Sequence, residues 1–193
     1  MTSDQQGAIA RRITDLADPK NTIIAVSLII GCGLYGLRGA GWAAIAIAFA
    51  AVLPILLIVH TAAEGRWADR HLTDRQKRMT VLPAISASVA AGICLQVLTS
   101  APRPMVGLTA AMWATITAIW PITRWWKISV HTAVLSGALA MLAQAFDPWW
   151  LAGAAGVAVV AWSRVRLRDH TPAQTLAGAA LGAVVAGLVF AAF

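Results

Sequence analysis

Long apolar runs with almost no charged residues dominate this chain of 193 residues. Seven runs can be marked off, and each is near the ~20 residues that a helix needs to cross a bilayer. They cover roughly residues 21–37, 40–61, 80–99, 106–123, 129–146, 148–163 and 173–192. With 59% hydrophobic and 12% charged residues and a mean hydropathy of +0.72, the composition excludes a disordered chain and an ordinary water-soluble domain.

These apolar runs are expected to be helices. Every backbone amide in lipid must be hydrogen-bonded internally, and the sequence has no alternating strand pattern. We therefore predict an all-α fold, a polytopic transmembrane bundle of six to seven spans, with a tail at 1–20 and a single membrane domain at 21–193. Small residues such as Gly178 and Gly182 permit close helix packing, which is ordinary in membrane bundles and leaves a homo-oligomer open.

The distribution of Lys and Arg predicts the orientation. Thirteen of the 15 cations lie in 1–20, 62–79, 124–127 and 164–168, which share one side, and only Arg38 and Arg103 lie on the other. Because cytoplasmic loops retain positive charge, we expect a multi-pass protein of the cell membrane with this side in the cytoplasm. The 62–79 loop interleaves acidic and basic residues, so it favours contact with membrane lipids and not with nucleic acid.

The residues able to carry chemistry gather at that same side. All four histidines, His60, His71, His131 and His170, are predicted there, beside hydroxyl and cationic side chains. Taken singly, each has an ordinary explanation as a solvated helix end or a topology signal. No cluster of carboxylates has metal-ligand spacing, and the two cysteines are far apart, so we expect neither a metal nor another cofactor.

The spacing of these residues carries more information than their identity. The stretch Ser163-Arg164-x5-His170 resembles the third signature of the type 2 phosphatidic acid phosphatase superfamily, Ser-Arg-x5-His-x3-Asp. Upstream, Lys127-Ile-Ser129-Val-His131 resembles the second signature, Pro-Ser-Gly-His. The stretch from His71 to Arg78 lies where the first signature, Lys-x6-Arg-Pro, belongs. The three matches occur in the family's order, on one predicted face, over about residues 69–182.

Several positions depart from the family pattern. His71 stands for the first-signature Lys, and Gln174 stands for the terminal Asp of the third signature. The other departures are Met79, Ile128 and Val130. The dipeptide Arg103-Pro104 is an alternative first motif, but the predicted topology puts it a membrane thickness of ~30 Å from the other two. His71 and Arg78 are therefore preferred.

The resemblance implies a membrane lipid phosphatase that hydrolyses a phosphomonoester or diphosphate of a polyprenyl or glycerolipid phosphate. It implies that His170 attacks phosphorus to form a phosphohistidine and that His131 protonates the leaving lipid oxygen. The implied phosphate-binding residues are His71, Arg78, Lys127, Ser129 and Arg164. This residue set suits phosphoryl transfer, which needs cations around the equatorial oxygens, an in-line nucleophile and an acid.

Gln174 is open to two interpretations that do not exclude each other. In place of the family's Asp, its carbonyl can accept the ring N–H of His170 across one helical turn, without supplying charge. It also stands third after Thr171, so that Thr171, Pro172 and Gln174 predict a capping box at the start of a helix. The missing carboxylate supports an alternative function, a catalytically weak or inactive member that binds anionic lipid or a partner membrane enzyme.

Overall fold

The computed structural model describes residues 3–63 and 75–193. These residues are mostly helical and contain no strand, which confirms the predicted all-α class. The helices are α1 (Ser3–Leu16), α2 (Pro19–Ile47), the π-helical turn η1 (Ala48–Val52), α3 (Leu53–Ala63), α4 (Arg75–Leu98), α5 (Arg103–Thr123), α6 (Val130–Ala145), the 3₁₀ turn η2 (Pro148–Gly153), α7 (Ala154–Arg166) and α8 (Pro172–Ala191).

Fewer helices are long and apolar enough to cross a membrane than the six to seven spans expected. In the part of the chain that is described, four stretches qualify: Pro19–His60, Met79–Leu98, Arg103–Thr123 and Pro172–Ala191. The predicted runs 21–37 and 40–61 correspond to the first stretch, which the structure counts as one. The run at 129–146 forms a helix of only 16 residues, and the run at 148–163 is divided between η2 and a 13-residue helix.

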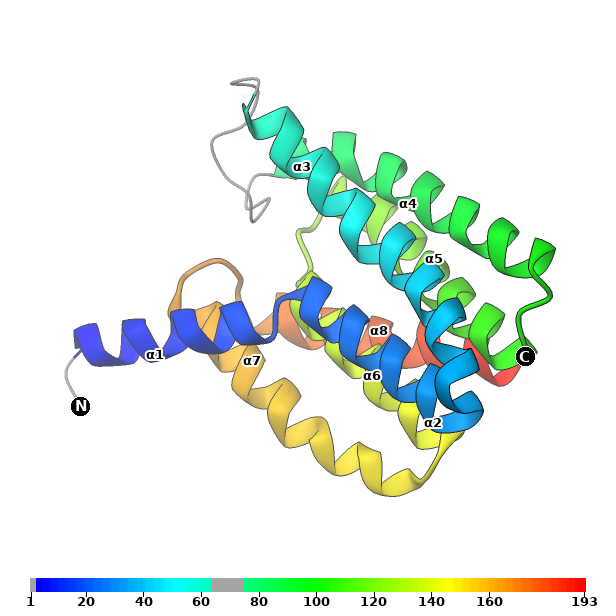
Figure 1. The fold of residues 1–193 in the computed structure, drawn as a ribbon. Coiled ribbons are helices and arrows are strands. Elements are labelled where there is room, and N and C mark those ends of the chain that lie inside the picture. Colours follow the sequence, from blue (N-terminus) through cyan, green and yellow to red (C-terminus); the bar gives the residue numbers. More distant parts are fainter. Residues whose placement is uncertain (1–2, 64–74) are drawn as a thin grey trace.

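A sharp bend at Gly36 interrupts α2. This residue has φ 57° and ψ −143°, a conformation that glycine adopts without steric cost. The chain reverses direction in this region, as Figure 1 shows, and the two arms pack so closely that a Cβ on Gly39 would overlap the Gly31 carbonyl. The second arm continues through η1 into α3, where Pro54 lacks the N–H of a regular helical turn.

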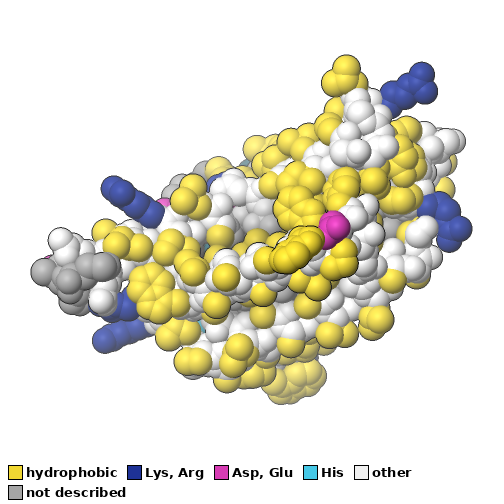
Figure 2. All heavy atoms as spheres, turned by 90° about the horizontal axis from the view of Figure 1, so that it is seen from below, with side chains coloured by type: hydrophobic (Ala, Val, Ile, Leu, Met, Phe, Trp, Pro, Cys, Tyr) yellow, Lys and Arg dark blue, Asp and Glu magenta, His cyan; other side chains and the backbone are white. Residues whose placement is uncertain are grey.

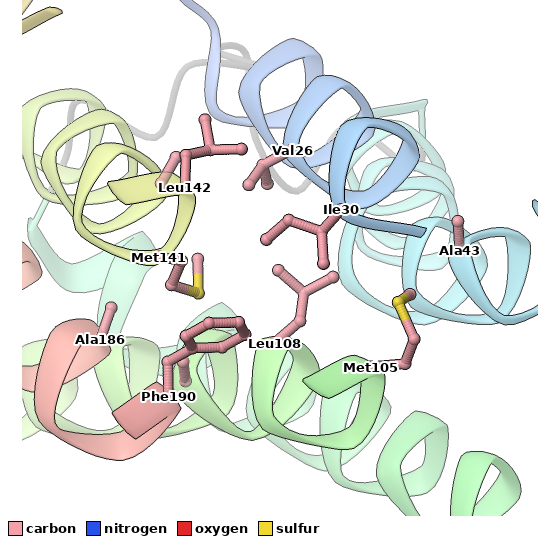
Figure 3. Close-up of a cluster of buried hydrophobic side chains, with 11 residues drawn as sticks. Val26, Ile30, Ala43, Met105, Leu108, Met141, Leu142, Ala186 and Phe190 are labelled. Carbon is pink, nitrogen blue, oxygen red and sulfur yellow. The ribbon is translucent and has the colours of Figure 1, made fainter. Parts of the chain in front are cut away.

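The buried core joins helices that are far apart in sequence. Figure 3 shows Ile30 of α2, Leu108 of α5, Met141 of α6 and Phe190 of α8 meeting in one cluster of buried apolar side chains. Many large apolar side chains remain exposed outside this core. Figure 2 shows them over much of the visible face, with Lys and Arg toward its two ends. Four long apolar helices and an apolar exterior are compatible with a membrane protein.

Helices α6 and α8 are parallel neighbours in a fixed register. Thr132 Oγ1 donates to the Thr175 carbonyl at 2.9 Å, and Ser136 Oγ donates to the Ala179 carbonyl at 2.7 Å. Both pairs are separated by 43 residues. The helices approach closely because Gly182 has no side chain, and a Cβ there would overlap the Ala133 carbonyl. The beginnings of α6 and α8 consequently lie at the same end of the bundle.

Candidate functional site

The register of α6 against α8 continues into the segments that precede them. His170 Nδ1 lies 3.2 Å from the Lys127 carbonyl, again across 43 residues. The backbone N–H of Ser129 donates to the Gln174 carbonyl at 3.1 Å. The stretches that resemble the second and third signatures are thus in direct contact, at the end of the bundle where α6 and α8 begin (Figure 1).

The imidazole of His170 is buried and held through Nδ1. This nitrogen lies 3.2 Å from the Lys127 carbonyl and 3.3 Å from Gln174 Oε1, and both oxygens are acceptors. Gln174 Oε1 also accepts the backbone N–H of Thr171 at 3.1 Å, which identifies it as the oxygen of the amide. We therefore assign the proton of a neutral ring to Nδ1, which leaves the lone pair on Nε2.

The predicted capping box at the start of α8 is confirmed. Thr171 is the N-cap, its hydroxyl accepts the N–H of Gln174 at 3.3 Å, and Gln174 Oε1 returns to the N–H of Thr171. The contact between Gln174 and the His170 ring is present as well. The same side chain therefore closes the helix end and touches the imidazole, as both interpretations of the sequence required.

Arg164 is buried next to the His170 loop. Arg168 takes a left-handed conformation with φ 59°, and the N–H groups of Asp169 and His170 both donate to the Arg164 carbonyl, at 3.1 and 3.3 Å. The Arg164 side chain is 2% exposed, and its Nη2 lies 3.0 Å from Asp169 Oδ2. The tight turn thus brings the Arg and the His of the Ser-Arg-x5-His stretch together.

Asp169 is a residue of this site that the sequence analysis missed. It lies immediately before His170, but the signature does not specify this position, so its ion pair with Arg164 was not anticipated. The signal that could have revealed it is an acidic residue five positions after an arginine, next to a histidine, in a link that is otherwise basic. Whether such a carboxylate reaches the guanidinium depends on the turn at Arg168, which is a property of the fold.

The N-terminal segment also supports the site. The sequence analysis treated residues 1–20 only as a tail, whereas residues 3–16 form α1, which packs against α7. The buried hydroxyl of Ser163 donates to the Val160 carbonyl at 2.7 Å and lies 3.1 Å from Thr14 Oγ1. Arg166 Nε donates to Gln6 Oε1 at 3.3 Å. Ser163 therefore anchors α1 and uses its only hydroxyl proton within α7.

Ser129 and His131 begin α6. Ser129 is its N-cap, and its Oγ accepts the N–H of Thr132 at 3.4 Å, which leaves the hydroxyl proton able to donate elsewhere. His131 lies in the first turn of the helix and is buried. His131 also lines a cavity, described next, whereas Lys127, Ser129, Arg164 and His170 are outside its described lining.

A largely apolar cavity of about 560 Å³ lies between α2, η1, α3, α4, α5 and α6. Its walls are formed mainly by aliphatic side chains, and η1 contributes Ala50 and Ala51. The polar lining residues come from the α1–α2 junction, the start of α6 and the middle of α5: Asp15, Asp18, Lys20, His131 and Thr115. A cavity of this size and character is typical of sites that bind apolar or amphiphilic small molecules.

Two predicted phosphate-binding residues cannot be placed with this group. His71 lies outside the described residues, and Arg78 belongs to α4 but its side chain is outside the described part of the chain. The structure brings together Lys127, Ser129, Arg164, His170 and Gln174 through the contacts given above, with His131 in the first turn of the adjoining helix. Comparison with known proteins adds no further assignment: no family model, curated protein or solved structure gives a significant match to this chain.

Proposed function

We propose that this chain is an integral-membrane phosphatase similar to the type 2 phosphatidic acid phosphatases, acting on a polyprenyl or glycerolipid phosphate or diphosphate. The observation that carries the proposal is the contact of His170 with Lys127 and Gln174, beside the buried Arg164. Two stretches separated by 43 residues meet at the Lys127 carbonyl, and we assign the nucleophile and the cations to these stretches. Together these residues supply the nucleophile and the positive charge that phosphoryl transfer needs, and no single one of them would supply both.

The proposed mechanism has two steps and uses His170 as nucleophile. The Nε2 lone pair forms a bond to phosphorus while the bond from phosphorus to the lipid oxygen breaks, and His131 gives that oxygen a proton. Water then attacks phosphorus, the N–P bond breaks, and phosphate leaves with His170 restored. His131 recovers its proton from the attacking water.

Charge stabilisation is assigned to the remaining residues of the group. In the transition state, the transferring phosphoryl group spreads negative charge over its equatorial oxygens, and a planar guanidinium can donate to two of them at once. Arg164 is proposed for this role, with Lys127 as a second cation and Ser129 as a hydroxyl donor. His71 and Arg78 complete the proposed phosphate-binding set.

The cavity supports a lipid substrate. Its aliphatic walls would bury a hydrocarbon tail, which is favourable in proportion to the apolar area removed from water. His131 lines its polar end, so a head group there would place its phosphate near the first turn of α6. A soluble phosphate ester has no hydrocarbon tail and would make no contact with these aliphatic walls.

We further propose a multi-pass cell-membrane protein whose site faces the cytoplasm. If the two arms of α2 and the shorter helices α6 and α7 are counted with the long helices, six to seven crossings result. The segments that carry Lys20, Lys127 and Arg164–Arg168 lie together at one end of the bundle in Figure 1, and the segments with Arg38 and Arg103 lie at the other end. Positive loops remain in the cytoplasm.

A labelling experiment tests this orientation. Arg124→Cys and Arg38→Cys, each made in a chain with Cys32 and Cys94 replaced, would be exposed to an impermeant thiol reagent in intact cells. We expect labelling at position 38 and none at 124 until the membrane is permeabilised. The reverse pattern would place the site on the outer face.

The test of activity is phosphate release in detergent. Purified protein would be supplied with polyprenyl phosphate, polyprenyl diphosphate and phosphatidic acid, and the same panel run with His170→Ala and with His60→Ala as a matched histidine control. We expect release with wild type and His60→Ala and loss with His170→Ala. Equal release by wild type and His170→Ala would show that the nucleophile is assigned wrongly.

A second function is favoured by one specific observation. Gln174 contacts His170 with a neutral amide where the family has a carboxylate, so a cationic imidazole receives no counter-charge from this position. An inactive protein that binds anionic lipid or a partner membrane enzyme would have this feature. It would bind vesicles containing phosphatidic acid without hydrolysis, its binding would be weakened by Arg164→Gln, and His131→Ala would leave binding unchanged.

A further inference from the structure

We propose that Asp169 is a built-in competitor for phosphate at Arg164 and thereby sets how tightly the site holds anions. This inference rests on the proposed function, because it assumes that Arg164 is the cation that receives the substrate phosphate. Asp169 is not specified by the signature that the surrounding residues resemble. Its role is inferred from the ion pair, the difference in burial between the two partners and the turn that holds them.

The ion pair occupies the group that phosphate would need. Arg164 Nη2 lies 3.0 Å from Asp169 Oδ2, which is within the distance of a close ion pair. The Arg164 side chain is 2% exposed, so its guanidinium has little freedom to turn toward a new anion. An incoming phosphate must therefore displace the carboxylate or share the guanidinium with it.

The two partners differ in their freedom to move. The Asp169 side chain is 25% exposed, and a released carboxylate can be solvated by water, whereas Arg164 stays where α7 holds it. The backbone N–H of Asp169 remains bonded to the Arg164 carbonyl, so the turn need not unfold when the side chain swings away. Displacement of this carboxylate is consequently a local rotation of one short side chain.

The exchange has a physical consequence for substrate and product. A phosphate monoester presents more charge and more acceptor oxygens than a carboxylate, so it can displace the Asp169 carboxylate from the guanidinium. The competition lowers the affinity for substrate and product phosphate by the same factor, and only the substrate has a hydrocarbon tail that adds binding energy elsewhere. Asp169 would thus weaken the binding of product phosphate and promote its release while the tail keeps the substrate bound.

The test measures binding of inorganic phosphate to the full chain in detergent by calorimetry. We expect Asp169→Asn to bind inorganic phosphate about tenfold more tightly than wild type, since a neutral amide competes less well for a guanidinium. Arg164→Gln should abolish this gain in the double variant. Asp4→Asn, which removes an exposed carboxylate from α1, should leave the affinity unchanged and controls for net charge.

Three outcomes would overturn the inference. They are equal affinity in wild type and Asp169→Asn, weaker binding by Asp169→Asn, and a gain that persists without Arg164. Helix content and the melting temperature of each variant would be measured alongside, and Asp169→Ser provides a second removal of the carboxylate. If Asp169 only braced the loop, both variants would lower kcat without lowering the inhibition constant of phosphate.

Failure of this inference can be separated from failure of the proposed function. Lipid phosphate hydrolysis by wild type, with phosphate affinity unchanged in Asp169→Asn, would overturn the competitor role and leave the phosphatase intact. No hydrolysis by wild type, with tighter phosphate binding in Asp169→Asn, would overturn the enzyme assignment and support the competition at Arg164.

Discussion

The Nδ1 atom of His170 lies 3.3 Å from the Oε1 atom of Gln174, one helical turn further along the chain. The same oxygen accepts the N–H of Thr171, so a single side chain orients the imidazole and caps α8. An amide gives the ring an acceptor without charge. Because the proposed phosphohistidine makes the ring more cationic, the charge of this partner should govern turnover.

The first prediction concerns that charge. Gln174→Glu keeps the length of the side chain and the capping box and adds a carboxylate, so we expect about a tenfold increase in the kcat for phosphate release, since charge-assisted hydrogen bonds are the stronger ones. Steady-state phosphate release at saturating substrate measures it. Gln5→Glu, on the exposed side of α1, is the control and should not change the rate. An unchanged or lower kcat in Gln174→Glu would contradict the proposed role.

The second prediction separates a guanidinium from a simple positive charge. Arg164→Lys retains the charge but loses the planar donors, so kcat/KM for a lipid phosphate should fall by about a hundredfold, which is typical of losing one transition-state donor. Arg166→Lys is the matched control, because Arg166 lies on the same helix and bonds to Gln6. Equal losses in the two variants would mean that Arg164 has no special contact with phosphate.

The third prediction tests the packing of α6 against α8. Gly182→Ala would force a Cβ into the Ala133 carbonyl, and we expect the folded state to lose about 1–3 kcal/mol, which is typical of overpacking. A lower melting temperature in detergent would show it. Gly156→Ala is the control, since a Cβ at Gly156 meets open space. If the two variants have the same melting temperature, the close approach at Gly182 does not contribute to stability.

The fourth prediction tests the cavity as a site for a hydrocarbon tail. Ile116→Trp fills part of the cavity with a larger side chain, and the KM for a long-chain lipid phosphate should rise about tenfold, as expected for a lost apolar contact. The KM for a short-chain, water-soluble analogue should stay the same. Val97→Trp, at an exposed position away from the lining, controls for the added aromatic ring. A parallel rise for both substrates would exclude the tail role.

The class of the fold could be predicted from the sequence, but the number of membrane-length helices could not. Hydropathy identifies the apolar segments of the chain. In lipid, the backbone of such a segment must form its hydrogen bonds internally, and this requirement correctly predicted helices. It does not give the length of each helix. The run at 129–146 formed a helix of 16 residues, and η2 divides the run at 148–163, so both runs produced helices shorter than expected.

By itself, the sequence determined the apolar helices and the capping box at Thr171 and Gln174, because both depend on neighbours within a few positions along the chain. Only the tertiary structure decided that Lys127 and His170 meet, since that contact requires the parallel register of α6 on α8 and the close approach at Gly182. It also decided that Asp169 reaches Arg164, because a left-handed turn at Arg168 folds the carboxylate back. The spacing of residues along the sequence determines which of them lie on the same helical turn. Tertiary packing determines which of these turns contribute residues to the same site.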